Sequence, residues 1–331
     1  MMKKFTTGVI IAFILGALLT GCTPKPTDIF EAIKANDLGK VEQIIKLYPE
    51  VVKIRKSKSK VIFSDWPLLY ACDRPKPDPK MITVLLKTSL KEHALLAIIN
   101  SFEELLNKSE FKLCDLFIND GFDINTPAPQ YMFNIIDDIV MAKKMPALEY
   151  LIAHHADLNF HKGSIEAPII DAARYDEPKV AKLLVKAGAN LNVLDYKNQT
   201  ALMDATFTKT GSAVIKILLD AGANINYRDD DGICAFLYAE TKKQIKLFLM
   251  HGQNITVKDN KGQGILYALM NNALSYPDRQ GMIYEAMMFA LQKGAEVNYK
   301  VDYGWSLLKV AIKAGVPSRF IKLLRAYGAH M

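Results

Sequence analysis

A short phrase, Gly-x-Asn-x-Asn or a close variant, recurs along most of the chain at nearly constant spacing. Copies begin at residues 121, 155, 188, 222, 252, 294 and 328, so successive copies are 34, 33, 34, 30, 42 and 34 residues apart. An internal period of about 33 residues is typical of repeat architectures, in which each unit packs only on its neighbours. The 331 residues therefore predict a stacked array rather than one compact core.

The rest of each unit keeps the same register. Six positions after the phrase stands a turn residue, followed four positions later by a large apolar residue and seven positions later by Ala, as in Asn198 with Leu202 and Ala205, Gly232 with Phe236 and Ala239, and Gly304 with Leu308 and Ala311. Apolar residues at such spacing line one face of a helix. Each unit is therefore expected to combine a projecting turn with helices.

The phrase and the turn together resemble the ankyrin repeat. Its Asp-x-x-Gly-x-Thr-Pro-Leu-His-x-Ala signature is partly kept at residues 195–205 and 229–239, and Thr-Pro-Leu-His is approached at 66–69 and 167–170 without being intact. The resemblance covers residues 28–331 and implies an all-α ankyrin-repeat solenoid of about nine helix-turn-helix repeats with hairpin loops. We expect helices over 29–35, 40–47, 92–106 and 111–119, and a break between helices at Pro277.

The N-terminus has the pattern of a targeting segment. Lys3 and Lys4 precede an apolar run over residues 9–19, and Leu-Thr-Gly-Cys at 19–22 is similar to the bacterial lipobox, in which the cysteine is lipidated. We therefore expect a lipoprotein signal peptide at 1–21, a lipidated Cys22 with a tether at 22–27, and an ankyrin-repeat domain at 28–331. An ordinary signal peptide or a membrane anchor is the alternative.

Thr23 after the cysteine, in place of Asp, resembles the signal for sorting to the outer membrane. The expected location is the bacterial cell envelope, with the protein lipid-anchored in the outer membrane and facing the periplasm; the cell exterior stays open as an alternative. The formal charge of +7, or +5 without Lys3 and Lys4, does not imply nucleic acid.

The remaining cysteines, Cys72, Cys114 and Cys234, lack the spacing of metal ligands. They are expected to be buried free thiols, with a disulfide between Cys72 and Cys114 as the alternative in an oxidising envelope. His154 and His251 are placed in the last turns of second helices, where a cation complements the helix dipole. No metal site and no cofactor are expected.

Catalytic motifs are missing from the sequence. It contains no Gly-x-Ser-x-Gly, no His-Glu-x-x-His and no phosphate-binding glycine loop. Residues 229–232, Asp-Asp-Asp-Gly, lack the alternate acidic ligands and closing Glu of a calcium loop, and their register predicts a hairpin turn. We expect no catalytic residues and no enzymatic activity.

The resemblance instead implies a binding surface. In an ankyrin stack the hairpin tips and the exposed shoulders of the inner helices line one concave face, and residues there have no duty in the core. The positions that match are Asp65, Arg74, Arg174, Tyr175, Tyr196, Lys197, Phe207, Asp230, Lys242, Tyr303, Trp305 and Lys313. A basic run at 53–60 adds Arg55 and Lys56, as a solvated loop or as a contact for an acidic partner or lipid head groups.

These features predict a monomeric, envelope-anchored protein that binds a protein partner on its concave face, reaches the membrane through its lipid and does not bind nucleic acid. Some bacterial ankyrin-repeat lipoproteins that this chain resembles are immunity proteins, which neutralise secreted antibacterial effectors such as phospholipases of the type VI secretion system. The alternative is a housekeeping periplasmic scaffold or docking protein, for example in protection against oxidative stress.

Overall fold

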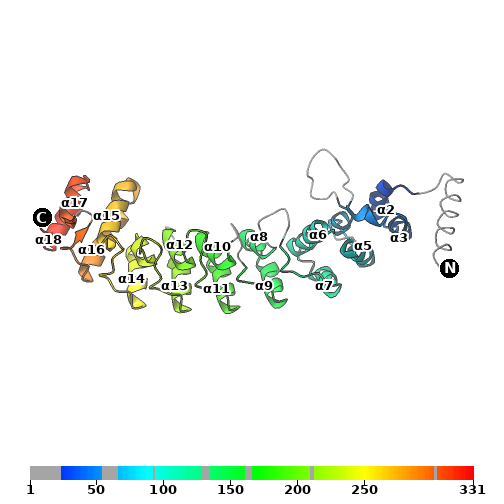
Figure 1. Cartoon of the computed structure of the whole chain (residues 1–331), viewed down its shortest axis with the longest axis horizontal. Helices are drawn as coiled ribbons and strands as arrows, with labels where there is room; N and C mark the ends of the chain where they lie inside the picture. Colours follow the sequence, from blue (N-terminus) through cyan, green and yellow to red (C-terminus); the bar gives the residue numbers. More distant parts are fainter. Residues whose placement is uncertain are drawn as a thin grey trace, which may run out of the picture. The chain divides into compact units, whose positions relative to one another are not determined.

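The computed structural model describes residues 24–53, 66–91, 94–127, 135–160, 166–208, 212–301 and 304–331. The chain divides into two compact units, Met1–Tyr131 and Met132–Met331, and each is built from pairs of helices (Figure 1). None of the helices in the described ranges has the length and apolar character needed to cross a membrane.

The N-terminal unit contains the elements η1 (Pro26–Asp28), α2 (Ile29–Ala35), α3 (Leu38–Leu47), η2 (Pro49–Lys53), α4 (Pro67–Cys72), α5 (Pro79–Lys91), α6 (Leu95–Asn107) and α7 (Phe111–Asn119). The predicted bounds of α2 and α7 are confirmed. Helix α3 begins two residues earlier than expected because the Asp37 side chain caps it, accepting the backbone N–H of Lys40 at 2.9 Å.

The C-terminal unit contains α8 (Ile135–Met141), α9 (Met145–Ala153), α10 (Pro168–Arg174), α11 (Pro178–Lys186), α12 (Ala201–Phe207), α13 (Ser212–Asp220), η4 (Ala235–Tyr238), α14 (Lys242–Met250), α15 (Ile265–Ser275), η5 (Pro277–Arg279), α16 (Gln280–Gln292), β1 (Lys300–Val301), β2 (Trp305–Ser306), α17 (Leu307–Lys313) and α18 (Ser318–Ala326). The two short strands pair antiparallel, with Lys300 opposite Ser306. The break predicted at Pro277 is confirmed.

Like elements stack on like elements in this unit. We call α8, α10, α12, η4, α15 and α17 the inner helices, and α9, α11, α13, α14, α16 and α18 the outer helices. Helix α10 packs on α12 and α12 on η4, while α11 packs on α13 and α13 on α14. In Figure 1, α8, α10 and α12 accordingly lie along one side and α9, α11, α13 and α14 along the other. The unit thus has an inner-helix face and an outer-helix face.

The recurring phrase ends each outer helix and ties neighbouring repeats together. Gly188 and Gly222 have positive φ angles of 87° and 84°, a conformation that glycine adopts without steric cost. The asparagines then bridge repeats, since Asn159 Oδ1 accepts the backbone N–H of Asn190 at 2.7 Å and Asn192 Oδ1 that of Asn224 at 2.9 Å. The residues that define the period are therefore structural.

Replacing Gly188 with Ala is expected to lower the free energy of unfolding by about 1 kcal/mol, because an L-residue pays to enter the left-handed region. No atom lies within 4 Å of the Cβ that would be added, so the cost is conformational. Gly281 is the matched control, since it lies inside α16 with similarly open space, and Gly281→Ala should stabilise by about 0.5 kcal/mol. Urea unfolding of both variants decides; destabilisation by both would contradict the explanation.

The hairpin turns between repeats share one hydrogen-bond pattern. Oδ1 of Asp195 accepts the backbone N–H groups of Lys197 and Gln199 at 2.8 and 2.7 Å. Asp229 and Asp259 each accept the two equivalent N–H groups of their own turns. The prediction of a hairpin turn at 229–232 is confirmed, because the first carboxylate organises the turn instead of facing a cation.

One repeat departs from the predicted register. The phrases at Gly222 and Gly252 are four residues closer than the 34 of the preceding step, and the inner element between them is only the 3₁₀ helix η4. The Thr241–Gln244 capping box then starts α14 at once. Lys242 was expected on the shoulder of an inner helix; this placement is wrong, because Lys242 is the first residue of outer helix α14.

Candidate functional site

The predicted lipidation site and several of the predicted binding residues fall outside the part of the chain that the structure describes. The former is Cys22, and the latter are Arg55, Lys56, Asp65 and Tyr303. Their roles stay predictions. Of the remaining positions, Arg74 belongs to the N-terminal unit and all the others belong to the C-terminal unit.

Arg74 is held within the N-terminal unit. Its Nη1 donates to the carbonyl oxygen of Ile33 at 2.7 Å and to Oδ1 of Asn36 at 3.1 Å, and Nη2 donates to the carbonyl of Lys34 at 3.4 Å. These acceptors lie at the C-terminal end of α2, where carbonyl groups lack partners inside the helix. The guanidinium therefore joins the first two repeats.

Arg174, at the end of α10, is the centre of a carboxylate cluster. Its Nη2 lies 2.9 Å from Oδ2 of Asp204 and 3.2 Å from Oδ2 of Asp195, and its Nη1 contacts Oε2 of Glu166. A fourth carboxylate, Asp171, lies 3.9 Å from Nη1. One guanidinium thus joins α10, α12, a hairpin turn and the segment before α10. We call these five residues the Arg174 cluster.

The Arg174 cluster carries more negative than positive charge in a half-buried setting. Asp195 and Asp204 are only 6% and 7% exposed, and Glu166 Oε1 is buried without a hydrogen-bond partner. Burial, opposed by Arg174, raises the pKa of Asp204 to about 6. Burial and repulsion by Glu166 raise the pKa of Asp171 to about 6. The cluster therefore binds protons more readily than exposed carboxylates do.

Exposed aromatic residues follow members of this cluster in the sequence. Tyr175 follows Arg174 and is 56% exposed, Tyr196 follows Asp195 and is 65% exposed, and Phe207 at the end of α12 is 49% exposed. The ring of Phe207 stacks on that of Tyr238 with centroids 4.2 Å apart, and the Lys197 ammonium lies 5.2 Å from the Tyr196 ring centroid. We call the Arg174 cluster with Tyr175, Tyr196, Lys197, Phe207 and Tyr238 the central face. It lies on the inner-helix side.

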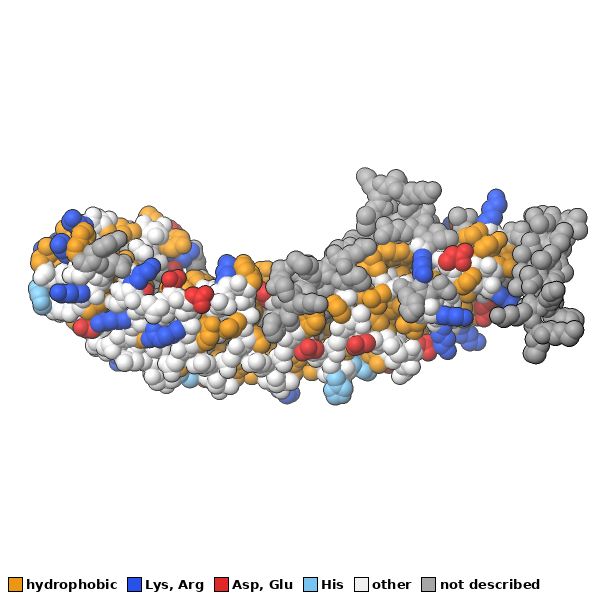
Figure 2. All heavy atoms as spheres, viewed as in Figure 1, with side chains coloured by type: hydrophobic (Ala, Val, Ile, Leu, Met, Phe, Trp, Pro, Cys, Tyr) orange, Lys and Arg blue, Asp and Glu red, His pale blue; other side chains and the backbone are white. Residues whose placement is uncertain are grey.

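The other predicted positions of the C-terminal unit lie apart from the central face or inside the turns. Asp230 accepts the side-chain amide of Asn198 at 3.1 Å, joining two hairpins. Trp305 on β2 lies beneath Lys309 and Lys313, whose ammonium nitrogens are 4.8 and 4.5 Å from its ring centroid. Lys and Arg side chains gather over this C-terminal end in Figure 2.

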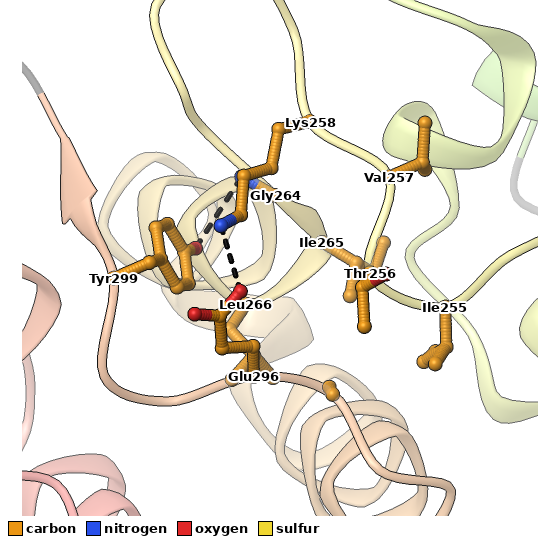
Figure 3. A pocket seen from close by; sticks show the side chains of 10 residues that line it. Ile255, Thr256, Val257, Lys258, Gly264, Ile265, Leu266, Glu296 and Tyr299 are labelled. Atoms are coloured by element: carbon orange, nitrogen blue, oxygen red, sulfur yellow. Dashed lines mark hydrogen bonds and ion pairs between the residues drawn. The ribbon is translucent and has the colours of Figure 1, made fainter.

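A small cavity lies between the phrases that begin at residues 252 and 294 (Figure 3). The Tyr299 hydroxyl accepts the N–H of Gly264 at 3.3 Å, and Lys258 Nζ lies 2.7 Å from Glu296 Oε2. Its volume of about 10 Å³ is room for a single water molecule. This cavity cannot enclose a substrate.

The cysteines and histidines have structural positions. Cys72, Cys114 and Cys234 are buried and free, as the first of the two alternatives predicts, and burial raises the pKa of Cys114 to about 12. His154 and His251 follow the last residues of α9 and α14, as predicted. Within the described ranges, no three His, Cys, Asp or Glu side chains are grouped so as to hold a metal ion.

The acidic neighbours of Arg174 were missed in the sequence. A signal for two of them exists, because Asp171 and Asp204 occupy the same position of consecutive repeats, two residues after the apolar position of the Thr-Pro-Leu-His motif. Asp195 was recognised only as the first residue of the ankyrin-like signature at 195–205. Glu166 occupies the variable position directly before the Thr-Pro-Leu-His motif, where Gln199 stands in the next repeat, so no periodic pattern marks it.

Comparison with known proteins agrees with this fold. A model of ankyrin repeats in three copies matches residues 138–229. A putative ankyrin repeat protein of fowlpox virus (strain NVSL), FPV034, is 32% identical over 206 residues, which is 62% of this chain and 38% of the viral protein. The chain therefore spans well under half the length of this relative.

Among solved structures, the crystal structure of the ankyrin repeat domain of Bcl-3, a member of the IkappaB protein family, superposes with a TM-score of 0.55 at 16% identity. The match covers 68% of this chain and 98% of the Bcl-3 chain. Ankyrin repeats indicate a protein–protein interaction scaffold, and no catalytic family is indicated. This chain contains ankyrin repeats, and its fold is that of an ankyrin-repeat protein.

Proposed function

We propose that this protein is a lipid-anchored immunity protein of the bacterial envelope, which binds a secreted antibacterial effector, such as a phospholipase, through the central face and blocks its active site. The observation that carries the binding role is the group of exposed aromatic residues, Tyr175, Tyr196 and Phe207, beside a charged cluster. Tyr and Arg are enriched among the residues that dominate protein interfaces. The protein itself performs no chemistry.

The first test is genomic, because the proposal predicts a gene for a lipase or another toxin next to the gene of this protein. The lipase found there is then the partner for the tests of rescue and binding. Growth of cells that export the lipase to the periplasm should be rescued by the wild-type chain. Tyr175→Ala combined with Phe207→Ala should abolish rescue and weaken binding at least tenfold, since both rings are expected in the buried centre of the interface. Leu47→Ala is the matched control, because Leu47 is 39% exposed and belongs to the N-terminal unit, outside both proposed binding faces. A wild-type chain that neither binds nor rescues would contradict the immunity role and favour a housekeeping scaffold.

The anchor is tested separately. Cys22→Ala should leave no thiol for lipidation at the end of the lipobox-like residues 19–22. Cells fed radiolabelled palmitate should label the wild-type protein and leave the variant unlabelled, because the thiol of Cys22 is the proposed site of acylation. Equal labelling of both proteins would rule out Cys22 as the anchor.

A further inference from the structure

The exposed charges of the outer helices in the C-terminal unit are mostly of one sign. The exposed Lys and Arg residues of these helices are Lys179, Lys182, Lys186, Lys216, Lys242, Lys243, Lys246, Arg319, Lys322 and Arg325. The exposed acidic residues on the same helices are only Glu149, Asp220 and Glu285. The outer-helix face is therefore strongly basic, although the chain as a whole is only mildly so.

The first three inner helices of the same unit have the opposite character. Helices α8, α10 and α12 carry Asp137, Asp138, Asp171 and Asp204, against one basic residue, Arg174. The two faces of the repeats from 135 to 220 thus differ in sign. A protein with such a distribution takes a preferred orientation at a charged surface.

The positive charges are largely uncompensated within the fold. Lys216 pairs with Asp220, and Arg319 donates to Oε1 of Gln280. Lys179, Lys182 and Lys186 of α11, and Lys243 and Lys246 of α14, form no ion pair with any described residue. Their spacing of three or four residues places them on one side of each helix, where like charges repel. An external anion would relieve this repulsion.

The chemistry of the face fits the head groups of a lipid surface. Lysine is a flexible point charge that needs no fixed geometry in its partner. The positive charges recur on the three successive outer helices α11, α13 and α14, as they would against a plane of phosphates. Met250, 69% exposed, lies on α14 in line with Lys243 and Lys246, so an apolar side chain accompanies the lysines. Among the described residues of the outer helices no aromatic ring is exposed for stacking on bases.

We infer that the outer-helix face of the C-terminal unit binds the anionic surface of a membrane, which directs the central face away from the lipid. This binding is independent of the identity of the protein partner. It also does not require the lipid on Cys22, which would only raise the local concentration of the face at the membrane.

The experiment uses residues 24–331, which include every described helix, so that neither a leader nor an acyl chain contributes. Flotation is measured with vesicles of phosphatidylcholine containing 30% phosphatidylglycerol, and with phosphatidylcholine alone. Binding should be at least tenfold stronger to the anionic vesicles and should weaken as salt rises from 50 to 300 mM.

Two variants with equal loss of charge decide whether the face matters. The first replaces Lys179, Lys182, Lys186, Lys243 and Lys246 with Gln; the matched control replaces five exposed lysines of the N-terminal unit, Lys34, Lys40, Lys46, Lys91 and Lys112, with Gln. Far-UV circular dichroism checks that both fold. The first should bind at least tenfold more weakly and the control within twofold of the original.

Equal loss in the two variants, or equal binding of the original chain to both kinds of vesicle, would overturn the inference. Tighter binding to a single-stranded 20-nucleotide DNA than to the anionic vesicles at the same salt would also overturn it, because the face would then prefer another polyanion. None of these outcomes affects the test of the immunity role, which is read from rescue of growth and from binding to the lipase.

Discussion

Replacing Arg174 with Leu is expected to lower the free energy of unfolding by about 2–4 kcal/mol at pH 7.5. The guanidinium faces four carboxylates, of which Asp195 and Asp204 are nearly buried. Removing the guanidinium leaves these carboxylates charged and unpaired where little water reaches them. The free energy of this desolvation is larger than the net contribution of the ion pairs to stability. The expected loss is below that for breaking a fully buried ion pair, because the Arg174 side chain is 32% exposed and water screens its charge.

Urea unfolding at two pH values measures this effect. At pH 5 the loss should be smaller than at pH 7.5, because protonation of Asp171 and Asp204, each with a pKa raised to about 6, removes part of the repulsion. Arg325→Leu is the matched control, since Arg325 is exposed on α18 and forms no ion pair with a described residue. A variant of Arg174 as stable as the control variant would show that the Arg174 cluster is solvated and weak.

Asp204→Asn is expected to act in the opposite direction, raising the free energy of unfolding by about 1–2 kcal/mol at pH 7.5. The folded-state pKa of Asp204 is about 6, above its unfolded value of 3.8. The folded state therefore binds the proton more tightly, and the stability from this group is complete below pH 3.8 and lost as the pH rises through 6. The neutral amide removes that loss and can still accept a hydrogen bond from Arg174.

The difference between Asp204→Asn and the wild type should therefore shrink as the pH is lowered from 7.5 to 4. Comparing the two proteins cancels the titration of groups far from Asp204, and leaves only that of Asp204 and of the carboxylates that interact with it, Asp195 and Glu166. Asp220→Asn is the control, because Asp220 is exposed and pairs with Lys216 and His251, which lower its pKa. The opposite result would be an Asp204→Asn variant that is less stable than the wild type at pH 7.5, with a smaller loss at pH 4. It would show that the charged Asp204 side chain stabilises the fold through Arg174.

Local rules explain how much of the fold the sequence predicts. Gly188 and Gly222 mark helix ends because glycine tolerates positive φ, and Asp195 and Asp229 mark turns because an Asp side chain accepts the N–H groups two and four residues later. Each rule acts within a few residues of chain. Because the same residues recur in each repeat, the same helix ends and turns recur with them, and helix bounds such as 29–35 and 111–119 are predictable.

The candidate site depends on contacts that no local rule contains. Arg174 matches a partner-facing position of the repeat, yet its guanidinium is surrounded by carboxylates from three other segments, including Glu166. The prediction for Lys242 was wrong because its repeat is shortened, so that α14 begins at Lys242. A constant period of about 33 residues does not reveal such a local change. The exposed aromatic residues Tyr175, Tyr196 and Phe207 were predictable because they stand where the repeat has no apolar requirement.

The proposed location of the protein-binding site on the central face of the C-terminal unit is most directly tested by hydrogen–deuterium exchange of the chain alone and in complex with the lipase. Exchange should slow in α10, α12 and the turn at 195–199, and should be unchanged in α11, α13 and α14. Slowed exchange in α11 and α14, with none in α10 or α12, would contradict the assignment of the central face as the binding site.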